Sequence, residues 1–125
     1  FIFISLPESY CYLHSLSYPI NKEKTNDIHF RLAPCAQLKL KIENVNCEGA
    51  GDIFDMDMKP IYAENYTAFS VPTKEGCYSN EFNTVEVPSG EWFVEWWVTR
   101  GGNTEYFTDT IELIEGELKE FEINY

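Results

Sequence analysis

Carboxylates are the most abundant chemically active side chains in this chain, which has 21 aspartates and glutamates against nine lysines and arginines. Hydrolysis of a glycosidic bond with retention of configuration needs two carboxyl groups about 5 Å apart across a cleft. Here the acids alternate with apolar residues, as in residues 91–97, and this alternation is typical of a strand face. The G-x-S-x-G signature of a serine hydrolase is missing from the sequence. We therefore expect no catalytic residue and no enzymatic activity.

Metal-ligating residue types are present, but their spacing does not suit a metal site. The chain has four cysteines without a CxxC pair and two histidines, His14 and His29, far from one another, whereas structural zinc needs closely spaced ligands. Asp52, Asp55 and Asp57 are the best calcium candidates, but the glycines around them do not match an EF-hand loop. We expect no metal and no cofactor.

The four cysteines, Cys11, Cys35, Cys47 and Cys77, allow two disulfides with three possible connectivities. Cys47 and Cys77 each fall in a predicted loop, and loops at the same end of a sandwich bring their side chains within reach of each other. The first pairing that we predict is Cys47–Cys77. Free buried thiols that pack as small hydrophobic residues are the alternative, and both remain open.

Aromatic side chains in residues 91–106 form the best candidate for a binding surface. Residues 91–99 alternate strictly, with Trp92, Val94, Trp96 and Val98 on the predicted core face. Phe93 and Trp97 fall on the opposite face among glutamates, and Tyr106 falls on the next predicted strand. Such aromatics stack against sugar rings or anchor a protein partner. The alternative is that residues 1–34, or a second copy of the chain, cover them and complete the core.

The elements that would position these side chains are strands. Period-two alternation recurs along the chain, turn signals follow every eight to twelve residues, and no useful length has helical periodicity. The expected strands are residues 1–5, 10–17, 27–32, 37–45, 53–59, 62–71, 91–99, 105–114 and 121–125, with a long polar loop at 73–83. This pattern predicts an all-β, predominantly antiparallel two-sheet sandwich, transthyretin- or Ig-like, with about seven to nine strands.

Residues 84–125 carry a resemblance to a known group of modules. The turn Pro88-Ser89-Gly90 precedes the strand that opens with Trp92, and the turn Gly116-Glu117 precedes a final alternating strand. This order resembles transthyretin-like (prealbumin-like) sandwich modules, which include the carboxypeptidase regulatory-like domain and the B-type repeats of surface collagen adhesins. Residues 32–44 resemble the opening of such modules in secreted or lipid-anchored Bacteroidetes proteins. The resemblance implies an architecture that hosts many functions, so it transfers no site.

Some of the adhesin repeats that this chain resembles join a first-strand lysine to a last-strand asparagine through an isopeptide bond. Lys39 or Lys41 and Asn124 are the positional candidates. The alternation turns these side chains toward solvent, where no desolvation shifts the pKa of the lysine toward reaction. We expect no isopeptide bond.

Composition limits the number of domains and the compartment. A length of 125 residues predicts one domain over residues 1–125, in which residues 1–34 are either extra strands or the tail of a preceding repeat. No stretch approaches the roughly 18 apolar residues of a membrane-spanning helix. We expect a secreted, periplasmic or cell-surface location, which includes a lipid anchor in the full-length precursor.

Charge and surface chemistry together give the functional expectation. The net charge of −12 argues against nucleic acid and anionic membranes as partners. We predict a non-catalytic structural spacer or protein-interaction module whose partner is a protein or glycan at the cell surface. A carbohydrate-binding module that uses Phe93, Trp97 and Tyr106 is the alternative, and an enzyme is the least favoured interpretation.

Overall fold

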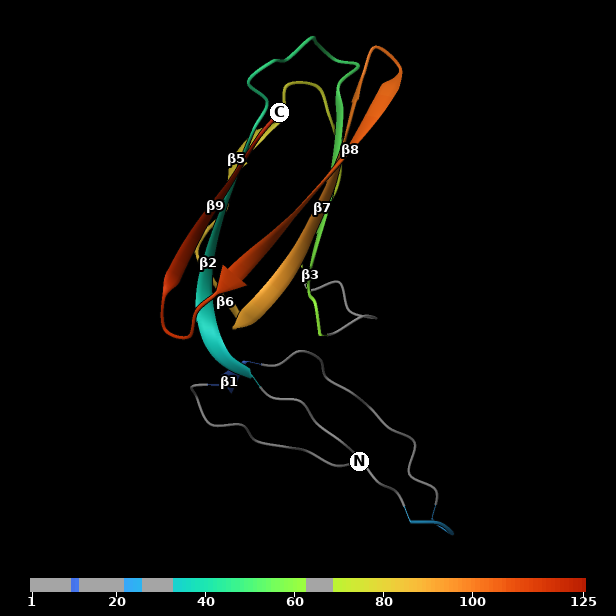
Figure 1. Cartoon of the computed structure of the whole chain (residues 1–125). Coiled ribbons are helices and arrows are strands. Elements are labelled where there is room, and N and C mark those ends of the chain that lie inside the picture. The colour runs from blue at the N-terminus through green and yellow to red at the C-terminus, as the bar shows by residue number, and fades with distance from the viewer. Residues whose placement is uncertain (1–9, 12–21, 26–32, 63–68) are drawn as a thin grey trace.

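The computed structural model describes residues 10–11, 22–25, 33–62 and 69–125 (Figure 1). Within these ranges the chain forms nine strands and no helix. The described residues therefore contain no helix that could span a membrane. The strands are β1 (Tyr10–Cys11), β2 (Ala33–Glu43), β3 (Ile53–Pro60), β4 (Phe69–Glu75), β5 (Ser79–Glu81), β6 (Val85–Pro88), β7 (Gly90–Arg100), β8 (Asn103–Leu113) and β9 (Leu118–Asn124).

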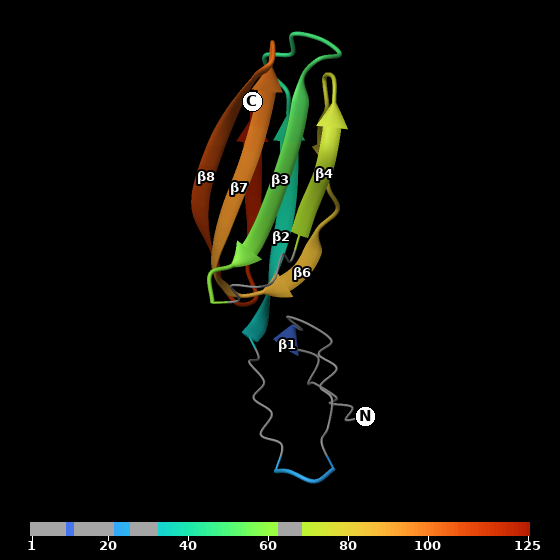
Figure 2. The same cartoon turned by 90° about the vertical axis from the view of Figure 1, so that its right-hand side faces the viewer.

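The strands form two sheets that pack face to face (Figures 1 and 2). In the first, which we call the β2 sheet, β5 and β6 pair with one edge of β2 and β9 pairs with the other, while β1 pairs with the start of β2. In the second, the β7 sheet, the order is β4-β3-β7-β8. Only β2 and β9 pair in parallel among the described strands. The predicted all-β, predominantly antiparallel two-sheet sandwich is confirmed.

The core lies between the two sheets and follows the alternation of the sequence. Trp92, Val94 and Val98 of β7 are at most 2% exposed, and Trp96 packs against the core while remaining partly buried. The indole nitrogen of Trp92 donates a 2.9 Å hydrogen bond to the Pro88 carbonyl, so this buried donor is satisfied. Strands β2, β3 and β8 supply further core side chains: Leu38, Leu40, Ile42, Phe54, Met56, Met58, Ile111 and Leu113.

The turn before β7 has the geometry that its sequence predicts. Gly90 has a φ of 118°, a conformation that side-chain-bearing residues rarely adopt. A Cβ atom at this position would also lie 3.1 Å from the ring of Tyr62, whose hydroxyl donates to the Ser89 carbonyl. Glycine is therefore required here for both backbone conformation and space.

Two predicted segments differ from the structure. The loop predicted at residues 73–83 is wrong, because β4 continues to Glu75 and β5 occupies Ser79–Glu81. All three residues of β5 are exposed and polar, so pairing with β2 rather than hydrophobic alternation holds this strand. Likewise β2 begins at Ala33, four residues before the predicted start. The strands predicted at 1–5, 10–17 and 27–32 lie outside the described residues, apart from Tyr10 and Cys11. So do residues 63–68 of the strand predicted at 62–71, of which Tyr62 lies in a turn and β4 takes up the end from Phe69.

Candidate binding surface

The outer face of the β7 sheet gathers the aromatic residues singled out in the sequence. Strand register places Asp55 of β3, Trp97 of β7 and Tyr106 of β8 in one row across the sheet. The neighbouring row contains Asp57, Glu95 and Thr108, and the next contains Lys59, Phe93 and Thr110. Figure 2 views this sheet face on. We call the side chains of these three rows the outer surface.

Trp97 and Tyr106 are the aromatic pair of the outer surface. Their ring centroids are 5.3 Å apart and their planes are tilted by 33°. Tyr106 is 53% exposed, whereas Trp97 is partly buried. The Tyr106 hydroxyl donates a 2.8 Å hydrogen bond to Glu95 Oε2, which raises the pKa of the phenol. The pair therefore presents two adjoining, angled rings rather than one flat platform.

Phe93 lies apart from this pair. It is partly buried and faces Lys59 on β3 and Thr110 on β8. Glu95 separates it from Trp97 along the strand, and four residues of extended chain span about 13 Å. The structure thus brings together two of the three predicted binding residues, and it places the third on the same face at some distance.

Three carboxylates surround the aromatic pair, and little positive charge from the described residues offsets their negative charge. Asp57 lies opposite Glu95 across the β3–β7 ladder, and Asp55 is two residues away on the same face. Burial raises the pKa of Asp57 first, and repulsion from Glu95 and Asp55 raises it further, whereas Lys59 acts in the opposite direction. In the described part of the chain, no lysine or arginine forms a salt bridge with these three acids. Asp55 instead accepts a 2.6 Å hydrogen bond from Thr73.

The outer face of the β2 sheet differs, because its acids are paired with lysines. Lys39 forms salt bridges with Glu81 and Glu120 on the strands to either side. Lys41 contacts Glu43 on its own strand and Glu122 on β9, each at 2.9 Å. Hydrogen bonds with these carboxylates hold the pKa of Lys41 above its usual value. These ion pairs join β2 to β5 and β9 on this face.

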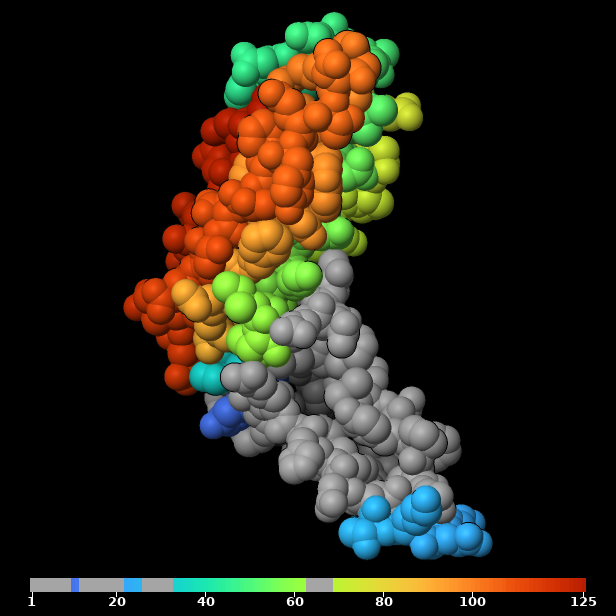
Figure 3. Space-filling model, turned by 45° about the vertical axis from the view of Figure 1, so that its right-hand side comes forward, coloured from blue at the N-terminus to red at the C-terminus, as the bar shows by residue number. Residues whose placement is uncertain are grey.

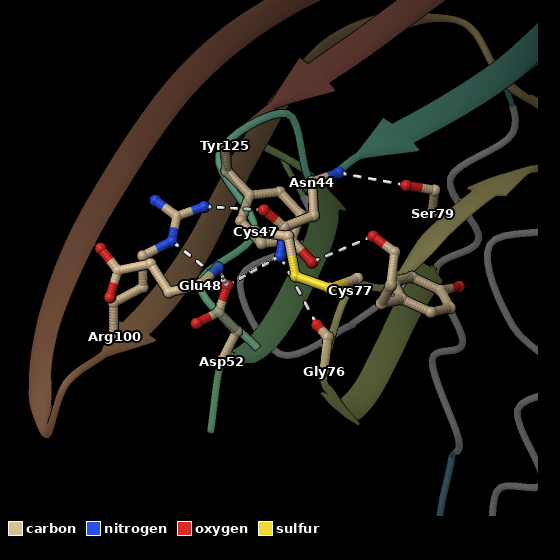
Figure 4. Close-up of polar contacts among 10 residues, drawn as sticks. Asn44, Cys47, Glu48, Asp52, Gly76, Cys77, Ser79, Arg100 and Tyr125 are labelled. Atoms are coloured by element: carbon tan, nitrogen blue, oxygen red, sulfur yellow. Dashed lines mark hydrogen bonds and ion pairs between the residues drawn. A yellow bond between two sulfur atoms is a disulfide. The ribbon is translucent and has the colours of Figure 1, made fainter. Parts of the chain in front are cut away.

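Asp52 belongs to a closed polar cluster at the end of the sandwich near the C-terminus (Figure 4). It is 2% exposed, and its Oδ2 accepts hydrogen bonds from Asn44 Nδ2 (3.0 Å), the Glu48 amide (3.1 Å) and Arg100 Nε (3.4 Å). Arg100 also donates to Asn44 Oδ1 and lies over the ring of Tyr125. These bonds, from Asn44 first, then Glu48 and Arg100, hold the pKa of Asp52 below its usual value. This carboxylate fixes the loop at residues 44–52 to β7.

The three aspartates weighed for calcium do not converge. Asp52 lies in the closed cluster, whereas Asp55 and Asp57 face the outer surface of β3. Among the described residues, the one group of potential ligands with metal-like spacing is Cys11, Cys35 and Glu86. The sulfur atoms of that group are joined to each other in a disulfide, so they offer no thiolate ligand.

The structure joins Cys47 to Cys77 and Cys11 to Cys35. The first bond connects the β2–β3 loop to the residues between β4 and β5, beside the Asp52 cluster (Figure 4). The second ties β1 to β2. Both bonds therefore hold segments at the margins of the β2 sheet.

Comparison with protein families, curated proteins and solved structures gives no match to this chain. What can be stated about its class is the observed architecture, a β-sandwich of two largely antiparallel sheets.

Sequence reasoning found the carboxylates of the outer surface only separately. It placed Asp55 and Asp57 on one strand face, as calcium candidates, and it placed Glu95 on the same face as Trp97. It did not bring the two sets together. Only the register of β3 against β7 brings Asp57 opposite Glu95, and that register comes from tertiary packing.

Proposed function

We propose that this chain is a non-catalytic, transthyretin-like module of a secreted, periplasmic or cell-surface protein, and that it is a spacer that also binds a protein partner. The observation that carries the proposal is the outer surface, where Trp97 and Tyr106 lie beside three carboxylates that form no salt bridge with any described lysine or arginine. The resemblance of residues 84–125 to transthyretin-like modules agrees with this role.

The chemistry of the outer surface suits a partner that presents lysine or arginine. A cationic side chain would relieve the repulsion between Asp57 and Glu95. The same cation is attracted to the faces of Trp97 and Tyr106, since aromatic rings carry negative charge on their faces. The net charge of −12 adds long-range attraction for a basic partner.

The disulfides support an export route. Disulfides persist in oxidising compartments and are rare in the cytosol, and the structure contains two of them in a chain of 125 residues. A secreted, periplasmic or cell-surface location, with or without a lipid anchor, accommodates them.

The proposal is tested by selecting a phage-displayed library of random dodecapeptides on the immobilised protein. We expect enrichment of lysine- and arginine-rich sequences whose binding is lost in Tyr106→Ala and Glu95→Gln. Glu120→Gln is the matched control, because it removes a carboxylate from the outer face of the other sheet. Selection of peptides without basic residues, or equal binding to all variants, would overturn the proposal.

A carbohydrate-binding module is the second candidate. The adjoining rings of Trp97 and Tyr106, with the Glu95 carboxylate at the phenol, offer both stacking surface and a hydrogen-bond acceptor for sugar hydroxyls. Titration calorimetry with cellohexaose, xylohexaose and chitohexaose tests it. Binding that Trp97→Ala abolishes, together with failure of the peptide selection, would replace the protein-partner proposal with this one.

A further inference from the structure

The two sheets of the sandwich differ in width. Beside β2, the β2 sheet has β5 or β6 on one edge and β9 on the other, which makes it three strands wide at these levels. The β7 sheet is four strands wide. Figure 2 shows β2 behind β3 and the red strand β9 behind β7, with no described strand behind the upper part of β8. One strand position, beside β9 and opposite β8, is therefore vacant among the described residues.

The inner face of β8 is exposed where this strand is missing. Phe107 faces inward, since it pairs with Trp96 in register, yet it is 38% exposed. Its ring stacks on the partly buried Trp96, with centroids 5.5 Å apart and planes 13° apart. Phe121 of β9 is also partly buried against the core. We call Trp96, Phe107 and Phe121 the open seam.

Strand β9 provides a backbone edge next to the open seam. It pairs with β2 on one side, and no described strand pairs with its other side. The free N–H and C=O groups of such an edge can pair with an added strand. Figure 3 shows this side of the molecule, with the orange atoms of β8 across its centre and the red atoms of β9 along its margin.

We propose that β9 accepts an extended segment of a partner protein as an added strand. Backbone pairing with β9 would supply affinity, and alternate apolar side chains of the segment would cover the open seam. Glu105 and Asp109 are exposed on the same face of β8 as Phe107, so the segment would carry lysine or arginine near both ends of its apolar face. The net charge of −12 disfavours a second copy of this chain as the occupant.

This site is separate from the outer surface. Tyr106 and Phe107 are adjacent on β8 and point to opposite faces of the β7 sheet, because their register partners are Trp97 and Trp96. Each residue is therefore the control for the other. Substitution at Tyr106 tests the outer surface, and substitution at Phe107 tests the open seam.

The experiment is an NMR titration that follows the ¹H–¹⁵N signals of the labelled protein as an amidated nonapeptide of alternating lysine and valine is added. We expect shifts in Leu118–Asn124 and in the Trp96 indole, and slower hydrogen exchange at alternate amides of β9. Phe107→Asp should weaken the binding that is read from the β9 shifts by about tenfold or more, as loss of a buried aromatic contact does. Tyr106→Asp should alter only the shifts of the outer surface and leave those of β9 unchanged. A glutamate–valine nonapeptide should bind more weakly, since it lacks the cations.

Three results would overturn the proposal. One is the absence of binding at peptide concentrations of about 1 mM. Another is a set of shifts confined to the outer surface and abolished by Tyr106→Asp, which would support the proposed function alone. The third is equal affinity in Phe107→Asp, for which the urea midpoint of the variant establishes that it is folded.

Discussion

The disulfide between Cys47 and Cys77 gives the sharpest stability prediction. Its cysteines are 30 residues apart in the chain, with Cα atoms 5.3 Å apart, and the closed loop contains β3 and β4. The loop-entropy relation for a closed loop of this size gives a loss of about 3.6 kcal/mol when the cross-link is removed. Such a loss is a large fraction of the roughly 5–15 kcal/mol that stabilises an ordinary domain.

The perturbation is the double variant Cys47→Ser/Cys77→Ser, unfolded in urea and followed by tryptophan fluorescence. We expect the midpoint to fall by about 1–3 M, from a loss of this size and ordinary urea slopes. The denaturant slope should rise, because the unfolded chain becomes more expanded once the cross-link is gone. Cys11→Ser/Cys35→Ser is the comparison, since its loop of 24 residues predicts a similar loss of about 3.4 kcal/mol.

A loss below about 1 kcal/mol in the Cys47/Cys77 variant would refute this reasoning. It would mean either that the bond does not form in the protein, or that the chain between the two cysteines is already restricted when unfolded. Titration of free thiols in the unfolded wild type separates the two cases. With both disulfides formed, this titration should find no free thiol in the wild type.

Three further predictions concern single residues. Asp57→Asn should raise the melting temperature at pH 7, because burial and neighbouring acids raise the pKa of Asp57 and so disfavour its charged form. The gain should vanish below about pH 4 and be smaller in Asp55→Asn, because Asp55 contributes only the smaller part of the repulsion and accepts a hydrogen bond from Thr73. Asp52→Asn should lower the melting temperature at pH 7 by several degrees and flatten its fall below about pH 4, where protonation removes the stabilisation from a carboxylate of lowered pKa. Trp92→Phe should cost about 1–3 kcal/mol in urea unfolding, because the buried Pro88 carbonyl loses the hydrogen bond that the indole donates. Melting curves by circular dichroism across pH check the first two, and an unchanged Trp92→Phe midpoint would contradict the third.

The sequence predicted the strands whose alternation is driven by the core. In β7, Trp92, Val94 and Val98 are buried as their parity requires, and β3 shows the same agreement at Phe54 and Met56. One-sided burial leaves a period-two signal in the sequence, so both strands could be found without a structure. The polar strand β5 carries no such signal and was missed.

The outer surface was predicted only in part. Trp97 and Tyr106 could be placed on neighbouring strands, because the turn between β7 and β8 fixes the hairpin register. The approach of Asp57 to Glu95 depends on β3 and β7, which are separated in sequence by β4, β5 and β6. No local pattern specifies that register, so the approach of Asp57 to Glu95 could not be predicted.

The open seam was likewise beyond sequence reasoning. Trp96 was assigned to the core from its parity, and it does face inward. Its partial burial results from the unequal widths of the two sheets, which depend on β9 pairing with β2. Residue alternation predicts which face a side chain occupies, but not whether a facing strand covers it.

The accessibility of Trp97 tests the central claim most directly, and acrylamide quenching measures it. Three variants, each retaining one tryptophan and phenylalanine at the other two positions, report on Trp92, Trp96 and Trp97 separately. Our account predicts strong protection of Trp92, which is fully buried, and clear quenching of Trp97 on the outer surface. Intermediate or strong quenching of Trp96 is expected from the open seam. If Trp97 is as protected as Trp92, the outer surface is covered in the protein and is not a binding surface.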